Sequence, residues 1–192
     1  MILILIIFIS YLLGSLPFGY ILTKFFVKKD IREIGSGNIG ATNALRTGNK
    51  SIGYATLFFD IFKAVIPIIF VKIYYHEYLY ISSLCVFLGH VFPLWLKFKG
   101  GKGVATYIGM LFSINIYLGV CFGLIWFVIF FIFKYSSLSS LISSLFIPII
   151  NFVIFKDEVN FFFIIMFVLI FYTHRENIKR LLNRTESKTK IY

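Results

Sequence analysis

The sequence predicts an all-α, polytopic membrane protein with about seven transmembrane helices. Hydrophobic residues make up 59% of the 192 positions and aromatic residues 20%, which is more apolar surface than a soluble domain of this length can cover. Apolar stretches of helical length alternate with short polar segments, as expected where lipid requires every backbone group to bond internally. Lys and Arg also concentrate in alternate polar segments, which is typical of chains oriented across a membrane.

The apolar stretches give the expected helices in chain order. We expect spans at residues 2–24, 51–73, 79–96, 103–115, 117–133, 138–155 and 160–173. The first stretch lacks a basic start and an A-x-A-like cleavage site, so we expect a retained helix and not a signal peptide. Residues 104–133 are divided near Ser113 and Asn115, which interrupt the apolar run. The fourth and seventh spans then fall below the usual ~17–25 residues, which indicates that flanking loops dip toward the hydrocarbon.

The basic residues predict the orientation. With the N-terminus outside, the inner segments hold six Lys and Arg in 24–50, three in 97–102, one at Lys134 and six in 175–190, which is 16 of the 19. The outer side is then expected to hold Lys72, Glu77, Lys156, Asp157 and Glu158. The C-terminus is cytoplasmic in this arrangement. Residues 1–192 are expected to form a single membrane-embedded domain, in which 175–192 is a short basic tail.

The net charge of +11 lies between apolar spans, so it indicates topology and affinity for anionic lipid or substrate, and not nucleic-acid binding. Cys85 and Cys121 fall inside apolar stretches and are interpreted as small core residues. The sequence has no metal-ligand spacing, no G-x-S-x-G motif and no H-x-x-x-x-D pattern. It therefore offers no obvious covalent nucleophile with a paired base.

The first inner loop combines glycines, short polar side chains and one arginine. Glycines allow positive φ angles, which turn backbone N–H groups into a concave anion-binding nest. Arg46 adds a planar fork that suits a phosphate. The residues concerned are Gly35, Ser36, Gly37, Asn38, Gly40, Thr42, Asn43 and Arg46. A flexible inter-helix turn is the simpler alternative, but it does not require this density of glycine and small polar residues, so we favour phosphate binding.

The second inner loop contains Gly100-Gly101-Lys102-Gly103. It resembles a phosphate loop but lacks the G-x-x-x-x-G-K-[ST] pattern, because Val104 follows where a Ser or Thr would bind magnesium. We therefore predict phosphate binding without a nucleotide. His90 lies in the preceding apolar stretch, where a histidine is more often a satisfied core residue than part of a site.

Two further polar groups have open interpretations. His174, Asn177 and Leu181 share one helix face at the start of the basic tail. A tail lying on the inner leaflet explains the Lys and Arg there, but it does not explain His and Asn on the apolar face. Asp60 and Lys63 are three residues apart inside the second span, where they form either a structural ion pair or part of the site.

Taken together, these motifs resemble the bacterial acyl-phosphate:glycerol-3-phosphate acyltransferase family. The resemblance covers nearly the whole chain, from residues 14–24 through 35–46 and 89–106 to 174–188. It implies a seven-span enzyme of the bacterial plasma membrane with its active site on the cytoplasmic face. The implied reaction transfers a fatty acyl group from acyl phosphate to the 1-hydroxyl of glycerol 3-phosphate. It gives lysophosphatidate and phosphate, the first acylation step of phospholipid synthesis.

The resemblance also implies roles for particular residues. The residues expected to contact the substrate phosphates and the reacting centre are Ser36, Arg46, Lys102, His174 and Asn177. The further substrate-binding or supporting residues are Gly35, Gly37, Asn38, Thr42, Asn43, His90, Gly100, Gly101, Gly103 and Glu186. Acyl-CoA and acyl carrier protein are not expected as donors. No cofactor, metal or protein partner is expected beyond the two substrates and the lipid bilayer.

Two positions depart from the family pattern. Ala64 follows Lys63 where a glycine is usual, and Arg184 stands ahead of Glu186 where the tail usually has a glycine. The first departure bears on helix packing and the second on the placement of Glu186. The alternative function is a transporter or channel for an anionic, phosphate-bearing solute, based on the Asp60–Lys63 pair and the prolines in the spans. A non-catalytic scaffold with basic lipid-binding loops is a third possibility.

Overall fold

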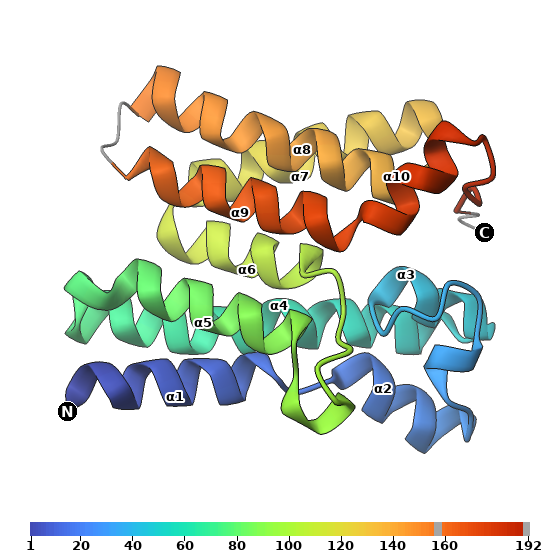
Figure 1. Ribbon diagram of the computed structural model, residues 1–192, viewed down its shortest axis with the longest axis horizontal. Helices are drawn as coiled ribbons and strands as arrows, with labels where there is room; N and C mark the ends of the chain where they lie inside the picture. The colour runs from blue at the N-terminus through green and yellow to red at the C-terminus, as the bar shows by residue number, and fades with distance from the viewer. Residues whose placement is uncertain (156–158, 190–192) are drawn as a thin grey trace. The chain divides into compact units, whose positions relative to one another are not determined.

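The computed structural model describes residues 1–155 and 159–189, and within these ranges it is helical and has no β-strand (Figure 1). The chain divides into two compact units, Met1–Ile114 and Asn115–Tyr192. The helices of the first unit are α1 (Ile2–Gly14), α2 (Phe18–Leu22), α3 (Ala41–Ala44), α4 (Lys50–Tyr74), α5 (Leu79–Val91) and α6 (Val104–Ile114). The helices of the second unit are α7 (Ile116–Phe133), α8 (Ser136–Ile150), α9 (Asn160–Thr173) and α10 (Arg175–Leu182).

In the part of the chain that the structure describes, four helical segments are long and apolar enough to cross a membrane: Ile2–Val27, His76–Leu96, Ile116–Phe133 and Ser136–Phe155. A fifth follows if α9 and α10, which meet at a 63° bend, are taken as one broken span. Helix α4 has 25 residues but carries Asp60 and Lys63, and α6 has only 11. The polytopic helical class is therefore confirmed, whereas the count of seven spans, the orientation and the single domain stay predictions.

The helix boundary expected near residue 115 is confirmed. Helix α6 ends at Ile114 and α7 begins at Ile116. Asn115 has an extended backbone, and its side-chain oxygen accepts a hydrogen bond from the Tyr117 N–H at 2.9 Å. An asparagine in this position satisfies one of the free N–H groups at a helix start. The polar residue that interrupts the apolar run is thus the N-cap of the next helix.

The first predicted span is helical but not continuous. Helix α1 stops at Gly14, and α2 starts at Phe18, directly after Pro17. Proline lacks an N–H and disfavours helical geometry in the residue before it, so the break falls at Leu16 and Pro17. Helix α2 then continues as a π-helical turn, Thr23–Val27, and ends at Lys28 with a φ of 59°. The break separates the apolar shaft of α1 from the segment that leads into the first polar loop.

Polar contacts join α1 to α5 within the first unit. The hydroxyls of Ser10 and Ser82 lie 2.9 Å apart, and the Tyr11 hydroxyl donates to the Phe92 carbonyl at 2.7 Å. Side-chain hydrogen bonds of this kind hold helices together where the surrounding lipid is as apolar as the helices. The first contact lies near the start of α5, and the second fixes its C-terminal end, from which the second polar loop departs.

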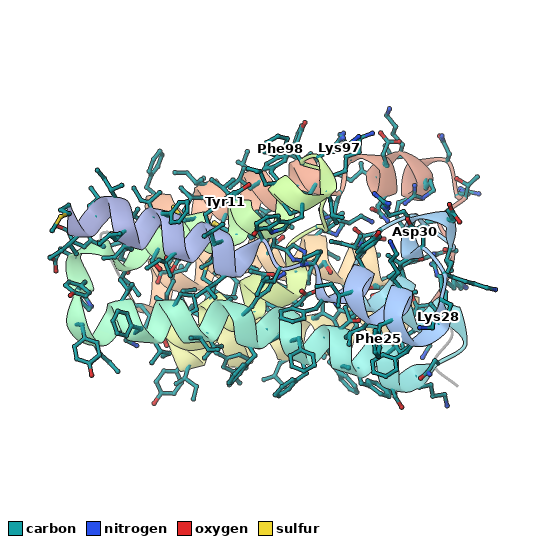
Figure 2. The ribbon with its side chains drawn as sticks, turned by 90° about the horizontal axis from the view of Figure 1, so that it is seen from below. Tyr11, Phe25, Lys28, Asp30, Lys97 and Phe98 are labelled. Atoms are coloured by element: carbon teal, nitrogen blue, oxygen red, sulfur yellow. The ribbon has the colours of Figure 1, made fainter. Side chains whose placement is uncertain are left out.

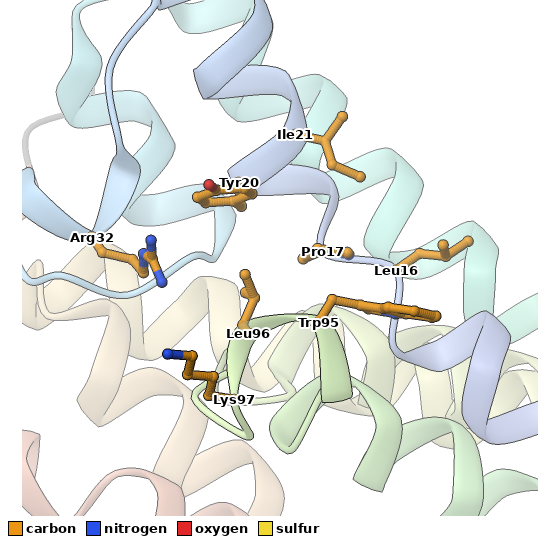
Figure 3. A pocket seen from close by; sticks show the side chains of 8 residues that line it. All are labelled: Leu16, Pro17, Tyr20, Ile21, Arg32, Trp95, Leu96 and Lys97. Atoms are coloured by element: carbon orange, nitrogen blue, oxygen red, sulfur yellow. The ribbon is translucent and has the colours of Figure 1, made fainter.

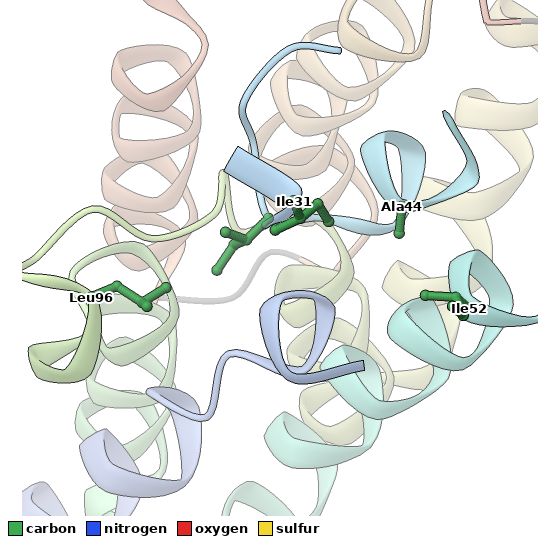
Figure 4. Packing of buried hydrophobic residues seen from close by; sticks show 5 residues of the cluster. Ile31, Ala44, Ile52 and Leu96 are labelled. Carbon is green, nitrogen blue, oxygen red and sulfur yellow. The ribbon is translucent and has the colours of Figure 1, made fainter. Parts of the chain in front are cut away.

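The loop between α2 and α4 is folded around its own apolar core (Figure 4). Ile31, Ile39 and Ala44 are each no more than 2% exposed, and they pack with Ile52 at the start of α4 and Leu96 of the 94–96 turn. A flexible connection would leave such side chains in solvent. The loop is therefore a packed substructure that places its glycines and polar residues at one end of the first unit.

The second unit contains α7 packed on α8, and α8 packed on α9. The serines of α8 satisfy their hydroxyls locally: the Ser139 and Ser143 hydroxyls donate to carbonyls four residues earlier, while Ser140 also accepts from the Trp126 indole N–H at 3.1 Å. After α10 the tail returns, and the Thr189 N–H donates to the Lys134 carbonyl at 2.9 Å. The charges assigned to the outer side at Lys156, Asp157 and Glu158, and the tail residue Lys190, lie outside the described residues.

Candidate phosphate-binding site

Asn43 holds the first loop in shape. Its side-chain oxygen accepts from the Ser36 N–H at 3.0 Å, and its amide nitrogen lies 3.0 Å from the Ile31 carbonyl and 2.8 Å from those of Ile34 and Asn38. Asn43 is 1% exposed, so these bonds form away from water. The carboxamide of Asn43 is thus engaged with the loop backbone and fixes the conformation of residues 31–38.

Gly35 brings Arg46 against the turn. Gly35 and Gly37 have φ angles of 53° and 71°, which a residue with a Cβ adopts only with strain. A Cβ at Gly35 would lie 2.7 Å from Arg46 Cδ and 2.5 Å from the side-chain oxygen of Asn43. The Arg46 side chain therefore passes directly over Gly35, next to Ser36, and both Ser36 and Arg46 are exposed. The loop presents a serine and a guanidinium together at its surface.

The remaining polar residues of this loop lie close by. A Cβ at Gly40 would lie 2.9 Å from the amide nitrogen of Asn38, so that amide is folded back over Gly40. Thr42 stands in the single turn of α3 beside Asn43, and it is half-buried. The structure thus places every predicted residue of the first loop in one compact group.

The glycines of the second loop let it lie directly on the end of α5. The N–H groups of Gly100 and Gly101 donate to the carbonyls of Val91 and His90 at 3.0 and 3.1 Å. A Cβ on Gly100 would lie 2.1 Å from the His90 carbonyl oxygen, and one on Gly101 would lie 2.2 Å from His90 Nε2. No side chain larger than hydrogen fits at either position without moving the loop.

Lys102 lies between this packed segment and the start of α6. Gly103 has a φ of 85° and packs on the ring of Phe87, and α6 begins at the next residue, Val104. The first N–H groups of a helix have no partner within the helix and carry partial positive charge. Lys102 is half-buried and lies two residues before the first residue of α6, and a cation next to a helix start is a combination that suits a phosphate.

The Asp60–Lys63 pair is tied to this loop through His90. The Lys63 ammonium lies 2.8 Å from the Asp60 carboxylate, 2.7 Å from the Leu16 carbonyl and 2.9 Å from His90 Nδ1. An ammonium group only donates, so His90 Nδ1 accepts and the proton of the neutral ring is on Nε2, which faces Gly101. The pair connects the break after α1, helix α4 and the floor of the second loop. The sequence had left open whether this pair is a structural ion pair or shapes the site, and the contacts link it to the residue on which the second loop packs.

In the second unit, Glu186 is fixed beside Asn177. One Glu186 carboxylate oxygen accepts from the Asn177 amide at 2.6 Å and from the Ser137 hydroxyl at 2.7 Å, while the other accepts from Arg180 Nε at 2.7 Å. Burial by itself would raise the pKa of Glu186. The three donors, Ser137 foremost, outweigh burial and hold the pKa of this carboxyl below its usual range. The departure at Arg184, which has a φ of 59°, leaves Glu186 in contact with Asn177.

His174 forms the corner between α9 and α10. Its Nδ1 lies 2.8 Å from the Ile170 carbonyl, and because a carbonyl only accepts, Nδ1 carries the proton. In the neutral ring the other nitrogen, Nε2, is then the proton acceptor. Asn177 follows three residues later, one turn along α10.

The sequence reasoning missed the partners that fix these residues. Ser137 and Arg180 were not singled out, although they hold Glu186. Arg180 lies six residues from Glu186 in the same basic segment, which is a weak signal, whereas Ser137 is 49 residues away and gave none. Within residues 1–155 and 159–189, no three His, Cys, Asp or Glu side chains are grouped so as to hold a metal ion.

The fold and the loops define a class of protein: a helical, membrane-embedded protein with basic, glycine-rich loops suited to phosphate groups. The chain belongs to the glycerol-3-phosphate acyltransferase family, whose sequence model matches residues 4–184. The glycerol-3-phosphate acyltransferase of Pelagibacter ubique is 69% identical over 183 residues, covering 95% of both chains. That of Mesorhizobium japonicum is 45% identical over 186 residues, covering 97% of this chain and 95% of the relative.

Solved structures agree with this assignment. The glycerol 3-phosphate form of PlsY, an integral membrane glycerol 3-phosphate acyltransferase, is 34% identical and matches with a TM-score of 0.93 over 99% of this chain and 96% of PlsY. The lysophosphatidic acid form of PlsY matches with a TM-score of 0.88 at 35% identity, over 98% and 95% of the two chains. The resemblance inferred from the motifs is confirmed at the level of family and acyltransferase activity.

Proposed function

We propose that this protein transfers a fatty acyl group from acyl phosphate to the 1-hydroxyl of glycerol 3-phosphate at the cytoplasmic face of the bacterial plasma membrane. The observation that supports the proposal is a pair of separate basic, glycine-rich features in the first unit, each of which suits a phosphate group. One is the Gly35–Ser36 turn with Arg46 packed over it, and the other is Lys102 at the start of α6. Both substrates of this reaction carry a phosphate, so two anion sites are required.

The chemistry needs no acyl-enzyme intermediate. The glycerol hydroxyl oxygen attacks the acyl carbonyl carbon, and a new ester C–O bond forms. The bond between that carbon and the phosphate oxygen breaks, and inorganic phosphate leaves with the bonding electrons. Phosphate is a good leaving group, so holding the two substrates in line and stabilising the developing charge supplies the acceleration.

The hydroxyl proton has two possible acceptors. His174 Nε2 is the acceptor nitrogen of a ring whose Nδ1–H is held by the Ile170 carbonyl. A phosphate oxygen of one substrate is the other acceptor. A general base must reach the proton within hydrogen-bond distance.

Several predicted residues receive distinct roles in this proposal. Ser36, Arg46 and Lys102 bind phosphate, and Asn177 presents its amide while Glu186 orients it. Asn43 acts as the frame of the first loop through its contacts with the backbone. The remaining predicted residues, which are Gly35, Gly37, Asn38, Thr42, His90, Gly100, Gly101 and Gly103, give the two loops their shape.

The transporter hypothesis loses its main support. It rested on the Asp60–Lys63 pair as a site for an anion near the middle of the membrane. The ammonium of Lys63 is instead within 3 Å of a carboxylate, a carbonyl and an imidazole nitrogen, all from this chain. A cation with these partners acts as an internal brace, which favours the enzyme.

The donor specificity is tested with purified protein in liposomes. We expect acyl phosphate and glycerol 3-phosphate to give lysophosphatidate and inorganic phosphate in equal amounts, and acyl-CoA or acyl carrier protein thioesters to give none above background. Product from thioesters at a comparable rate would contradict the donor assignment. Uptake of labelled glycerol 3-phosphate into sealed proteoliposomes, without lysophosphatidate, would support the transporter instead. Activity in inside-out but not right-side-out vesicles of cells expressing the protein is expected for a cytoplasmic site.

A further inference from the structure

A hollow lies in the first unit at the break between α1 and α2 (Figure 3). Its volume is about 630 Å³. It is lined by Leu16, Pro17, Tyr20, Ile21, Arg32, Trp95, Leu96 and Lys97. None of these residues belongs to the proposed acyltransferase site, so the hollow needs an explanation of its own.

The hollow is apolar inside and basic at its rim. Figure 3 shows the Arg32 guanidinium and the Lys97 ammonium on one side of the space and the Trp95 ring on the other. The Arg32 side chain donates three hydrogen bonds to the Asp30 carboxylate, at 2.6, 3.0 and 3.1 Å, and its guanidinium lies 5.0 Å from the centre of the Tyr20 ring. The contact with Arg32 keeps the pKa of the Asp30 carboxyl below its usual range, so this pair is ionised at neutral pH. With Lys97 added, the rim has a surplus of positive charge.

A separate, apolar hollow lies along α1 and α5. It has a volume of about 540 Å³ and is lined by Ile4, Ile7, Phe8, Tyr11, Cys85, Leu88, Phe92 and Phe98. In Figure 2, where α1 runs across the view, Phe98 lies toward Tyr11 and its neighbour Lys97 lies toward the loop that carries Asp30. One turn of chain therefore borders both hollows, with an aromatic side chain facing one and a cation facing the other.

Hydrogen bonds attach the turn at residues 92–98 to the end of α1. The Trp95 indole N–H donates to the Ser15 hydroxyl at 2.8 Å, and the Tyr11 hydroxyl donates to the Phe92 carbonyl at 2.7 Å. Lys97 and Phe98 both have positive φ angles, 52° and 61°, which fold the chain back sharply at this point. The turn thus holds the two hollows in a fixed relation to each other.

We propose that these hollows bind one anionic diacyl phospholipid, with its phosphate between Arg32 and Lys97 and an acyl chain in the hollow along α1 and α5. Arg32 Nε and one terminal nitrogen already donate to Asp30, so Arg32 offers a phosphate its other terminal nitrogen, beside the Lys97 ammonium. Tryptophan is favoured at the level of lipid headgroups. The α1 residues that line this hollow, from Ile4 to Tyr11, rise about 10 Å, which is roughly a third of the ~30 Å hydrocarbon core. An apolar hollow of that length below a cationic rim matches part of an acyl chain below its anionic headgroup.

The place of Arg32 in the chain suggests a use for this lipid. Arg32 lies in the turn Ile31–Glu33, and the carbonyls of Ile31 and Ile34 on either side of it accept hydrogen bonds from Asn43. A phosphate bound to Arg32 would therefore rest against the stem of the loop that carries Ser36 and Arg46. This makes the lipid a structural ligand of the folded loop, distinct from either substrate.

The two tryptophans of the chain allow a direct test. Trp126→Phe leaves Trp95 as the single fluorophore, and Trp95 is 59% exposed, so lipid can reach it. The protein is placed in phosphatidylcholine vesicles, and phosphatidylglycerol or phosphatidylcholine with brominated chains is added at equal, low mole fraction. We expect the brominated phosphatidylglycerol to quench Trp95 several-fold more strongly. Equal quenching by the two lipids would overturn the proposal.

Matched variants separate a specific site from general surface charge. Lys97→Gln is expected to abolish most of the preference for phosphatidylglycerol, while Lys99→Gln, an exposed residue of the same turn that does not line the hollow, is expected to retain it. Both variants should keep acyltransferase activity, which shows that they are folded. If both variants lose the preference equally, the effect is bulk electrostatics and the site is refuted.

Competition distinguishes this site from the enzyme's own substrate site. Glycerol 3-phosphate, inorganic phosphate and lysophosphatidate are added to the quenched sample at concentrations that saturate turnover. Quenching that stays unchanged supports a separate phospholipid site, even if the donor assignment above proves wrong. Relief of quenching by any of the three would place the hollow within the acyltransferase site and overturn the proposal.

Discussion

Gly100→Ala is the substitution whose effect follows most directly from the geometry. The added Cβ would lie 2.1 Å from the His90 carbonyl oxygen and 2.6 Å from that of Val91, whereas ordinary contact begins at 3.4 Å. Both obstacles are backbone atoms of a helix end, so they cannot rotate away. The second loop must therefore lift from α5 by about 1.3 Å, the difference between 2.1 and 3.4 Å.

The cost of that shift has two parts. Lifting the loop breaks the hydrogen bonds from Gly100 to Val91 and from Gly101 to His90, each of which is worth ~1 kcal/mol. The variant should thus lose about 2 kcal/mol of stability. A misplacement of about 1 Å at a positioning group costs ~10²-fold in rate, and Lys102 is two residues away. We expect kcat/KM to fall by about two orders of magnitude.

The assay follows lysophosphatidate formation from saturating and limiting glycerol 3-phosphate, with thermal unfolding measured in the same detergent. Gly123→Ala is the matched control, because no atom lies within 4 Å of the Cβ position on this helical glycine of α7. Alanine there should leave activity unchanged and add up to ~1 kcal/mol of helix stability. Wild-type kinetics for Gly100→Ala, or equal losses in both variants, would refute the reasoning about this loop.

Four further changes test the other contacts. Arg46→Ala should lower kcat/KM by roughly a hundredfold or more with near-normal thermal unfolding, since each charge-assisted bond to phosphate contributes ~1.5–3 kcal/mol; unchanged kinetics would remove Arg46 from the site. Asn43→Ala should instead unfold at a clearly lower temperature, because it leaves buried loop carbonyls unsatisfied; a stable but inactive variant would contradict its framing role. Lys63→Met leaves the Asp60 carboxylate buried without its cation and should lower the free energy of unfolding by ~3–5 kcal/mol, and the Asp60→Leu, Lys63→Met double variant should recover much of that loss. A fully stable single variant would contradict a structural role for the pair. In the wild type, the stability that the ionised Glu186 contributes is lost as the pH falls from the ordinary carboxyl pKa of 4.5 toward its lowered folded-state pKa, and Glu186→Gln should lack this contribution at every pH. If the free energy of unfolding changes in parallel for the two proteins over that range, Glu186 contributes none.

Features that depend on neighbouring residues could be predicted from the sequence. The polar interruption at Asn115 is an N-cap, and the capping bond is made to Tyr117, two residues away. The His174 and Asn177 spacing correctly predicted a helix, α10, at the start of the tail. The family itself followed from the joint presence of three short motifs in one chain. The count of spans is harder, because a short α6 and a charged α4 do not carry a full-length apolar signal.

Features that depend on long-range packing could not be predicted. Asn43 was expected to bind substrate, and nothing in its neighbourhood indicates that its amide reaches back twelve residues to Ile31. Lys63 contacts Leu16 and His90, which are 47 and 27 residues away. Such contacts arise only once α1, α4 and α5 have packed together. The sequence therefore identified which residues are unusual, while packing determined whether each one binds substrate or holds the loop that does.

The central claim is that the two glycine-rich loops are phosphate-binding sites, and equilibrium binding of radiolabelled glycerol 3-phosphate in the absence of donor measures this directly. The account predicts saturable binding to the wild-type protein that inorganic phosphate displaces and glycerol does not. Of the variants Arg46→Ala and Lys102→Ala, the one whose loop holds glycerol 3-phosphate is expected to weaken that binding at least tenfold, whereas Lys99→Gln leaves it intact. Binding that is displaced by glycerol, or that survives the combined loss of Arg46 and Lys102, would contradict it.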